Sequence, residues 1–236
     1  MVIDTIENSN YNQFKLFLFL KATCSGKVRI DSYKRQSIAQ ILKFKGERSV
    51  ERYLQLLINR EWIGYNPKSK VYFIKAFDKI RRLENFRTRT AAVFSLQDLD
   101  KIKAFCSGVL FAYIYKVSLF REKKKKAASH MQNASKPSAS SLTFFPIATT
   151  GIESLFNISK AKASRLKHLA AQSNYLEFKH QYKDLNIPKE QHKHFLSVAE
   201  PNLAEKVVVK EGRIPLQLPD LIYPYITLSY RRKLKT

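Results

Sequence analysis

The chain has 236 residues, of which 44% are hydrophobic and 12% aromatic, so it has enough apolar material for a core and is not a wholly disordered basic tail. Its 43 Lys and Arg against 19 Asp and Glu give a net charge of +24, and residues 1–90 and 91–236 are each strongly basic. Nucleic acid is therefore the leading partner, and a lysine-rich solvated surface is the alternative.

The two cysteines and the absence of a long apolar run favour a location in the cytoplasm. Cys24 and Cys106 both lie in apolar surroundings, which is typical of core residues in a reducing compartment. The N-terminus lacks the basic and apolar regions of a signal peptide. The most lipid-like run, 104–115, has 12 residues without a charge, short of the roughly 18 that span a bilayer. We expect a cytoplasmic, nucleoid-associated protein with no membrane partner.

Two helices are predicted at the start of the chain. Residues 11–22 hold so many Phe and Leu residues that they predict a core helix with little exposed face. Asp31 or Ser32 then offers an N-cap for a second helix over 33–43. Gly46 interrupts the chain after that helix.

A third helix and a hairpin follow. The helix begins near Ser49, and strands at 62–65 and 71–74 flank a polar turn at 66–70. One apolar stripe of this helix carries Val50, Leu54, Leu57 and Ile58.

The run 48–64 resembles the recognition helix and first wing strand of winged helix-turn-helix DNA-binding domains. In that family a small polar residue and an apolar residue start the helix, Arg and two leucines follow at fixed spacing, and an aromatic–Ile step opens the wing. The residues that match are Ser49, Val50, Arg52, Leu54, Leu57, Trp62 and Ile63. The resemblance covers residues 11–77 and implies a helix that enters the major groove beside a β wing.

The second half is expected to repeat this plan. Thr149 or Thr150 caps a short helix, the chain turns at 157–158, and Ser159 caps a helix over 160–170. A long helix from Asp98 to about Lys125 would serve as the first helix of this second unit.

The repeat can be aligned by its leucines. Setting Leu54 on Leu166 brings Leu57 onto Leu169, and the start of the wing then agrees within one residue. Lys162 takes the place of apolar Val50 in this alignment.

The rest of the chain predicts a connection and a second wing. Residues 127–141 are rich in Ala and Ser and cannot bury enough surface to offset their ordering entropy, so we expect a mobile connection. A strand and tight turn are expected at 206–214, and a strand at 224–230. The expected organisation is an N-terminal domain over 1–90, a long helix over 91–126, a linker over 127–145 and a C-terminal domain over 146–236.

Candidate DNA contacts in the first unit follow from how a helix reads the major groove. Arg52 pairs with guanine, Gln55 with adenine, and Ser49 with a phosphate or either base. The alternative is that Arg52 pairs with Glu51 or Glu47 and that Gln55 is merely solvated. Phosphate contacts are predicted for the turn before the helix and for the hairpin tip, through Lys43, Lys45, Arg48, Lys68 and Lys70.

The second recognition helix carries cations on several faces, so some of them must miss the DNA. The predicted contacts are Lys160, Lys162, Ser164 and Lys167.

Catalytic patterns are weak. The chain has 6 Gly and no Gly-rich phosphate loop, and the acids are scattered, so neither an enzyme nor a cofactor or metal is expected. His192 and His194 resemble the paired histidines of rolling-circle nicking enzymes, but charged Lys193 stands where that family has an apolar residue.

The expected fold is mainly α with small β-hairpin wings, an α+β protein of two tandem winged-helix domains. Two such units resemble plasmid and phage replication initiators, which implies sequence-specific binding of double-stranded DNA and recruitment of replication proteins, with a homodimer left open. A transcriptional regulator that uses the same helices is the first alternative. A basic RNA- or virion-associated protein that packages nucleic acid without reading its sequence is the second.

Overall fold

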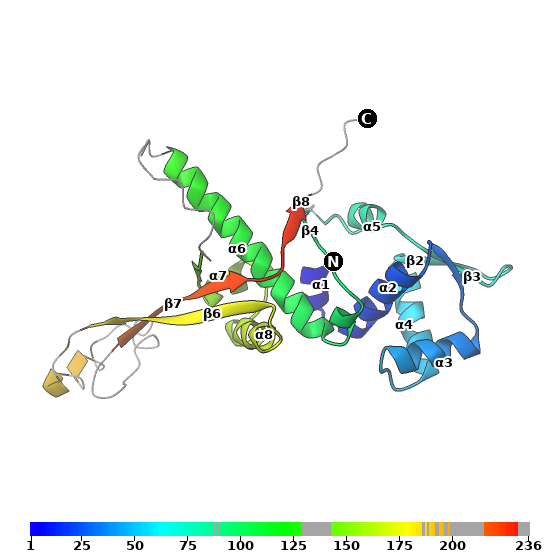
Figure 1. Cartoon of the computed structure of the whole chain (residues 1–236), viewed down its shortest axis with the longest axis horizontal. Coiled ribbons are helices and arrows are strands. Elements are labelled where there is room, and N and C mark those ends of the chain that lie inside the picture. The colour runs from blue at the N-terminus through cyan, green and yellow to red at the C-terminus, as the bar shows by residue number, and fades with distance from the viewer. Residues whose placement is uncertain are drawn as a thin grey trace.

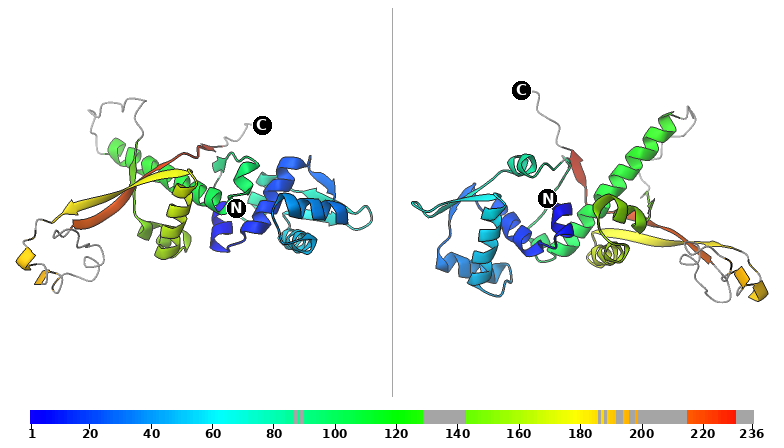
Figure 2. Two further views of the ribbon diagram at one scale, coloured as in Figure 1. Left: turned by 60° about the horizontal axis from the view of Figure 1, so that its bottom comes forward. Right: turned by 180° about the vertical axis from the view of Figure 1, so that it is seen from behind.

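A computed structural model describes residues 1–86, 88, 90–128, 143–185, 187, 189–191, 194–195, 198 and 215–230. It combines helices with small antiparallel sheets, so the α+β class is confirmed. Figure 1 shows the long helix α6 in the middle, with the first half of the chain on one side and the elements α7, α8, β6 and β7 on the other. Figure 2 shows the same separation from two further directions.

The first half contains the predicted helices and hairpin together with short elements that the sequence did not predict. Its elements are α1 (Val2–Glu7), α2 (Tyr11–Thr23), β1 (Lys27–Arg29), α3 (Ser32–Ile41), α4 (Glu47–Asn59), β2 (Ile63–Asn66), β3 (Val71–Ile74) and α5 (Phe77–Leu83). The core helix α2 buries Phe14, Leu16, Phe17, Leu18 and Leu20. Asp31 caps α3 as expected, because its side chain accepts a hydrogen bond from the Lys34 N–H.

The second half begins with strand β4 and is built on α6. Its elements are β4 (Thr90–Ala92), η1 (Gln97–Leu99), α6 (Ile102–Ala128), β5 (Phe145–Ile147), α7 (Thr149–Phe156), α8 (Lys160–Gln172), β6 (Leu176–Asp184), η2 (Lys189–Gln191), β7 (Pro215–Pro224) and β8 (Leu228–Tyr230). The strand predicted at 206–214 lies outside the described residues. Only 228–230 of the strand predicted at 224–230 forms β8, and most of β7 lies where no strand was predicted.

The two halves repeat one order of elements. A helix, a strand, two helices and two strands follow one another as α2-β1-α3-α4-β2-β3 and again as α6-β5-α7-α8-β6-β7. Each sheet places the third strand between the other two, in the orders β1-β3-β2 and β5-β7-β6, with antiparallel pairing throughout. The second hairpin is much longer than the first (Figure 1).

The repeat has a register that corrects the alignment by leucines. The N-caps Gly46 and Ser159 begin helices of 13 residues each, and strands β2 and β6 start at Ile63 and Leu176. Glu61 and Asn174, which precede these strands, both have positive φ. All of these pairs are 113 residues apart, one residue more than the offset that the leucines gave.

Residues 129–142 connect two elements of the second half and do not separate the halves. Helix α6 before this segment packs against β5 and α8 after it. The long helix was expected to lead the second domain, with the linker over 127–145 after it; residues 127 and 128 of that range lie in α6, and Phe145 begins β5. The first half passes into the second near residue 90, where Ala91 of β4 pairs with Ser229 of β8.

Helix α6 is the central packing element. Helices α1, α2 and α8 all contact it. Gly108 permits close approach, because a Cβ there would lie 2.6 Å from the Tyr175 Cβ and 2.8 Å from the Ile226 Cδ1. The segment Ile102–Lys124 is long and apolar enough to cross a membrane, although the charge-free run 104–115 inside it is too short to do so alone. In the structure, 61% of the most apolar window of this segment is buried inside the protein.

Candidate nucleic-acid interface

Helix α4 presents the face that the sequence predicted. Val50, Leu54 and Leu57 are at most 2% exposed and pack into the core. The opposite face carries exposed polar side chains at positions i, i+4, i+7 and i+11 of one stripe, which are Arg48, Arg52, Gln55 and Asn59. The helix therefore has one buried apolar face and one exposed face of side chains that can form hydrogen bonds.

The side chains of this stripe are held by neutral partners. Arg52 Nη2 donates to Tyr53 Oη at 3.3 Å, and Gln55 Nε2 donates to Asn59 Oδ1 at 2.9 Å. Glu47, one of the two acids predicted as alternative partners of Arg52, lies 3.7 Å from Arg35 and accepts a hydrogen bond from the Ser32 hydroxyl. Within the part of the chain that is described, Arg52 forms no ion pair, so its charge stays available at the surface.

A cationic hollow of about 530 Å³ lies where α3 turns into α4. It is lined in part by Lys15, Lys43, Lys45, Arg48, Ser49 and Arg52. Lys43 has a left-handed backbone at this turn, with φ 55°. Lys43, Lys45 and Arg48 are exposed, whereas Ser49 is half-buried.

Two of these lysines are engaged in different ways. The Lys43 ammonium lies 3.1 Å from Asp100, but both side chains are more than half exposed, so this ion pair contributes little to stability. Lys15 is buried, donates to the Leu42 carbonyl at 2.7 Å and lies over the Phe44 ring. Burial lowers the pKa of the Lys15 ammonium.

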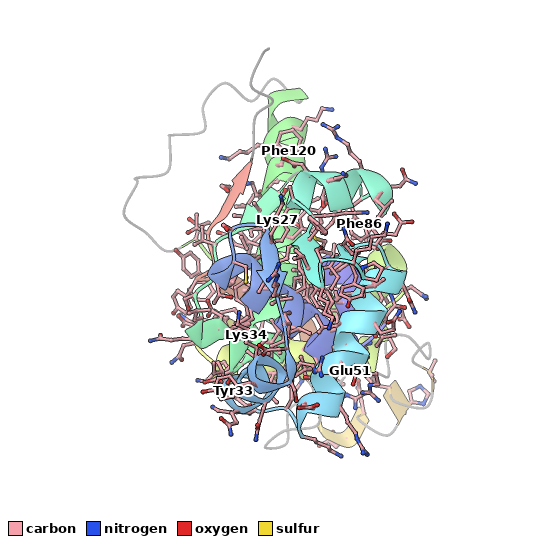
Figure 3. All side chains as sticks on the ribbon, turned by 90° about the vertical axis from the view of Figure 1, so that its right-hand side faces the viewer. Lys27, Tyr33, Lys34, Glu51, Phe86 and Phe120 are labelled. Atoms are coloured by element: carbon pink, nitrogen blue, oxygen red, sulfur yellow. The ribbon has the colours of Figure 1, made fainter. Side chains whose placement is uncertain are left out.

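The tip of the first hairpin matches its prediction in geometry. Asn66 Oδ1 accepts from the N–H groups of Lys68 and Ser69 at 3.0 and 3.4 Å, which closes the turn. Lys68 and Lys70 are both exposed beside it. Figure 3 views this end of the molecule, with Tyr33 and Lys34 labelled on α3 and Glu51 on α4.

Helix α8 corrects two of the predicted contacts. Lys167 is 4% exposed, and its ammonium is hydrogen-bonded to buried Asp220 on β7, so it cannot reach a phosphate. The Lys162 ammonium donates to the Ile6 carbonyl at 2.6 Å and so caps the end of α1. The other two predicted contacts differ in exposure, since Lys160 is exposed and Ser164 is half-buried.

The repeat register points to residues of α8 that were not among the predicted contacts. At 113 residues from Arg48, Arg52, Gln55 and Asn59 stand Ala161, Arg165, His168 and Gln172, and every one of them is exposed. Arg165 thus takes the place of Arg52, and His168 that of Gln55. Counting from the two N-caps would have found this match, whereas matching leucines did not.

Both helices border one hollow of about 710 Å³. Its lining includes Arg52 and Leu56 of α4, Lys101 and Lys103 at the start of α6, and Leu169 of α8. Residues from the two repeated units therefore reach the same concave part of the surface.

Comparison with protein-family models, with curated proteins and with solved structures finds no match to this chain. Among the described residues, no group of three or more His, Cys, Asp or Glu side chains could hold a metal ion. His192, together with Lys193, lies outside the described residues.

Proposed function

We propose that this protein binds double-stranded DNA in a sequence-specific way, with α4 and α8 as the recognition helices of two tandem winged-helix units. The observation that carries the proposal is the pair of exposed stripes on α4 and α8, which stand 113 residues apart. The repeated order of elements and the two identical sheet orders support the same conclusion.

The chemistry of the stripes suits base reading. Arg52 and Arg165 each offer two parallel donors to the guanine O6 and N7 acceptors in the major groove. Gln55 pairs in the same way with adenine. The helix diameter fits the width of the major groove, and the buried faces of both helices hold their stripes outward.

Cations beside the stripes supply the affinity that is independent of sequence. Lys43, Lys45 and Arg48 lie at the turn before α4, and Lys68 and Lys70 lie at the hairpin tip. Contacts of this kind with phosphates position a protein on a duplex without specifying bases. The net charge of +24 attracts the duplex from a distance.

We further propose a role in replication initiation of a plasmid or phage, in the cytoplasm and with replication proteins as partners. Two units with the same order of elements in one strongly basic chain support this role, which needs no catalytic step. Direct repeats among the bound sequences would favour replication, whereas a promoter palindrome would favour a transcriptional regulator.

Selection of bound sequences from random duplex DNA tests the proposal. The selected duplex and a scrambled duplex are then compared across salt concentrations. A sequence reader keeps a preference of about 10³-fold or more for the selected duplex. If both duplexes bind with the same affinity and the same salt dependence, the protein packages DNA without reading it and the proposal is refuted.

A further inference from the structure

Four aromatic rings run from α8 out along the second hairpin. His168 of α8 meets Phe178 of β6 with ring centres 5.0 Å apart, Phe178 meets His180 at 5.2 Å, and His180 meets Tyr182 at 6.2 Å. We call these four side chains the aromatic row. Phe178, His180 and Tyr182 are alternate residues of one strand, and their ring contacts place them on the same face of β6.

The outer rings of the aromatic row are open to solvent. Tyr182 is 51% exposed, the His180 side chain is 42% exposed, and His168 belongs to the exposed stripe of α8. Adjoining exposed rings form a contiguous surface that a flat ligand can cover by stacking.

The inner part of the aromatic row is held rigidly. The Lys167 ammonium lies 4.5 Å from the centre of the Phe178 ring and is bound to Asp220. The other oxygen of Asp220 lies 2.8 Å from His180 Nδ1. This fixation removes part of the entropy cost that a ligand would otherwise meet on binding.

Cations of the strand lie on its other face. Lys179 alternates with the aromatic residues, sits over the Phe144 ring at 4.3 Å and lies 3.7 Å from Glu177. The face with the aromatic row is therefore suited to flat rings and not to a phosphate backbone. A cation for the phosphate backbone of the nucleic acid is available at the His168 end of the aromatic row, since Arg165 is one helical turn from His168.

The spacing of the aromatic row decides which form of nucleic acid fits. The rings that share β6 have centres 5.2 and 6.2 Å apart. Stacked bases in a duplex follow one another at about 3.4 Å along each strand, and their faces are covered by neighbouring bases. A duplex thus offers neither the spacing nor the free faces that the aromatic row needs, whereas the bases of a single strand can offer both.

We propose that the aromatic row binds unpaired bases of single-stranded DNA by stacking. This inference rests on the proposed function as a DNA-binding protein and adds a second form of DNA to it. Stacking on aromatic side chains tolerates any base, so the site would bind without sequence preference, unlike the stripes of α4 and α8.

Fluorescence anisotropy of the full-length protein with labelled oligo(dT), which forms no duplex, tests this inference. Tyr182→Ala should raise the Kd for oligo(dT) about fivefold or more, while the Kd for duplex DNA stays within about twofold. Tyr182→Phe keeps the ring and should bind like the wild type. Tyr33→Ala is the matched control, because Tyr33 is 78% exposed on α3, at the opposite end of the molecule (Figure 1).

Photo-cross-linking of a 4-thiothymidine oligonucleotide to the wild-type protein gives an independent readout that needs no variant. The expected site of the cross-link is one of the residues 178–182. Equal oligo(dT) affinity of Tyr182→Ala and wild type, equal losses on both forms of DNA, or an adduct elsewhere would overturn the inference. Tighter binding of oligo(rU) than of oligo(dT) would also overturn the assignment to DNA.

The proposed function and the aromatic row fail in different ways. A wild-type protein that binds neither duplex nor single strand refutes both. A wild-type protein that binds duplex DNA but not oligo(dT) refutes the aromatic row alone.

Discussion

The helices α4 and α8 stand at equivalent places in the two halves but are held to their cores by different chemistry. Leu54 of α4 is 2% exposed and packs among apolar side chains, while Lys167, at the same position of α8, is buried against Asp220. Both helices nevertheless expose the residues at the same four equivalent positions. The register of the repeat, and not the residue type, therefore identifies the outward face of each helix.

The largest effect should come from breaking the buried pair of the second half. Lys167→Met leaves the Asp220 carboxylate buried without its ammonium, which should lower the free energy of unfolding by about 3–5 kcal/mol. The double change Lys167→Met with Asp220→Leu makes this core resemble that of the first half and should recover most of the loss. Urea unfolding followed by circular dichroism measures both, and a loss below about 1 kcal/mol for the single change would contradict the burial of the pair.

The equivalent arginines should each specify a base. Arg52→Ala and Arg165→Ala should each cost about 1–3 kcal/mol of binding free energy on the preferred duplex, because a bidentate pair with a base is lost. Each change should relax the preference at a different base position. Competition binding with single-base variants of the selected site measures this, and the idea that both helices read DNA fails if either arginine can be removed without loss.

Of two lysines that were both predicted to contact DNA, one should affect stability and the other DNA affinity. Lys162→Met removes a charged hydrogen bond to the Ile6 carbonyl and should lower the free energy of unfolding by about 1–2 kcal/mol, with DNA affinity unchanged. Lys43→Met removes only an exposed ion pair, so it should weaken DNA binding with little change in stability. Thermal unfolding and duplex binding of both variants test this contrast, which the opposite pattern would contradict.

The smallest effect is expected at the hairpin tip. Lys68→Ala should weaken binding to all duplexes by a similar factor and reduce the slope of log affinity against log salt by about one, because one phosphate contact is lost. Measurement of the slope on selected and scrambled duplexes checks this. A loss confined to the selected duplex would mean that Lys68 takes part in base reading.

Elements with a clear period were predictable from sequence. The Phe and Leu residues of 11–22, the apolar stripe of α4 and the strands around the turn at 66–70 all agree with the structure. Caps were predictable as well, since Asp31 and Ser159 each accept a hydrogen bond from the first turn of their helix. The prediction that Thr149 or Thr150 caps α7 is wrong, because Ala148 stands at the N-cap and both threonines lie inside the helix.

Short elements and long-range pairs were not predictable from sequence. Helix α1 has 6 residues and strands β1, β4 and β5 have 3 each, too few for a period to emerge. The buried state of Lys167 depends on Asp220, which is 53 residues away in the chain. A lysine at a helical core position looks like a surface residue until its partner is known, which is why Lys167 was predicted as a DNA contact.

Selection of duplex DNA by the wild-type protein, Arg52→Ala and Arg165→Ala in parallel is the most direct test of the central claim. If α4 and α8 are equivalent readers, the wild type will enrich a defined sequence, and each variant will lose information at its own separate positions within that sequence. Random DNA that stays unenriched with the wild type, or identical profiles from all three proteins, would contradict the account.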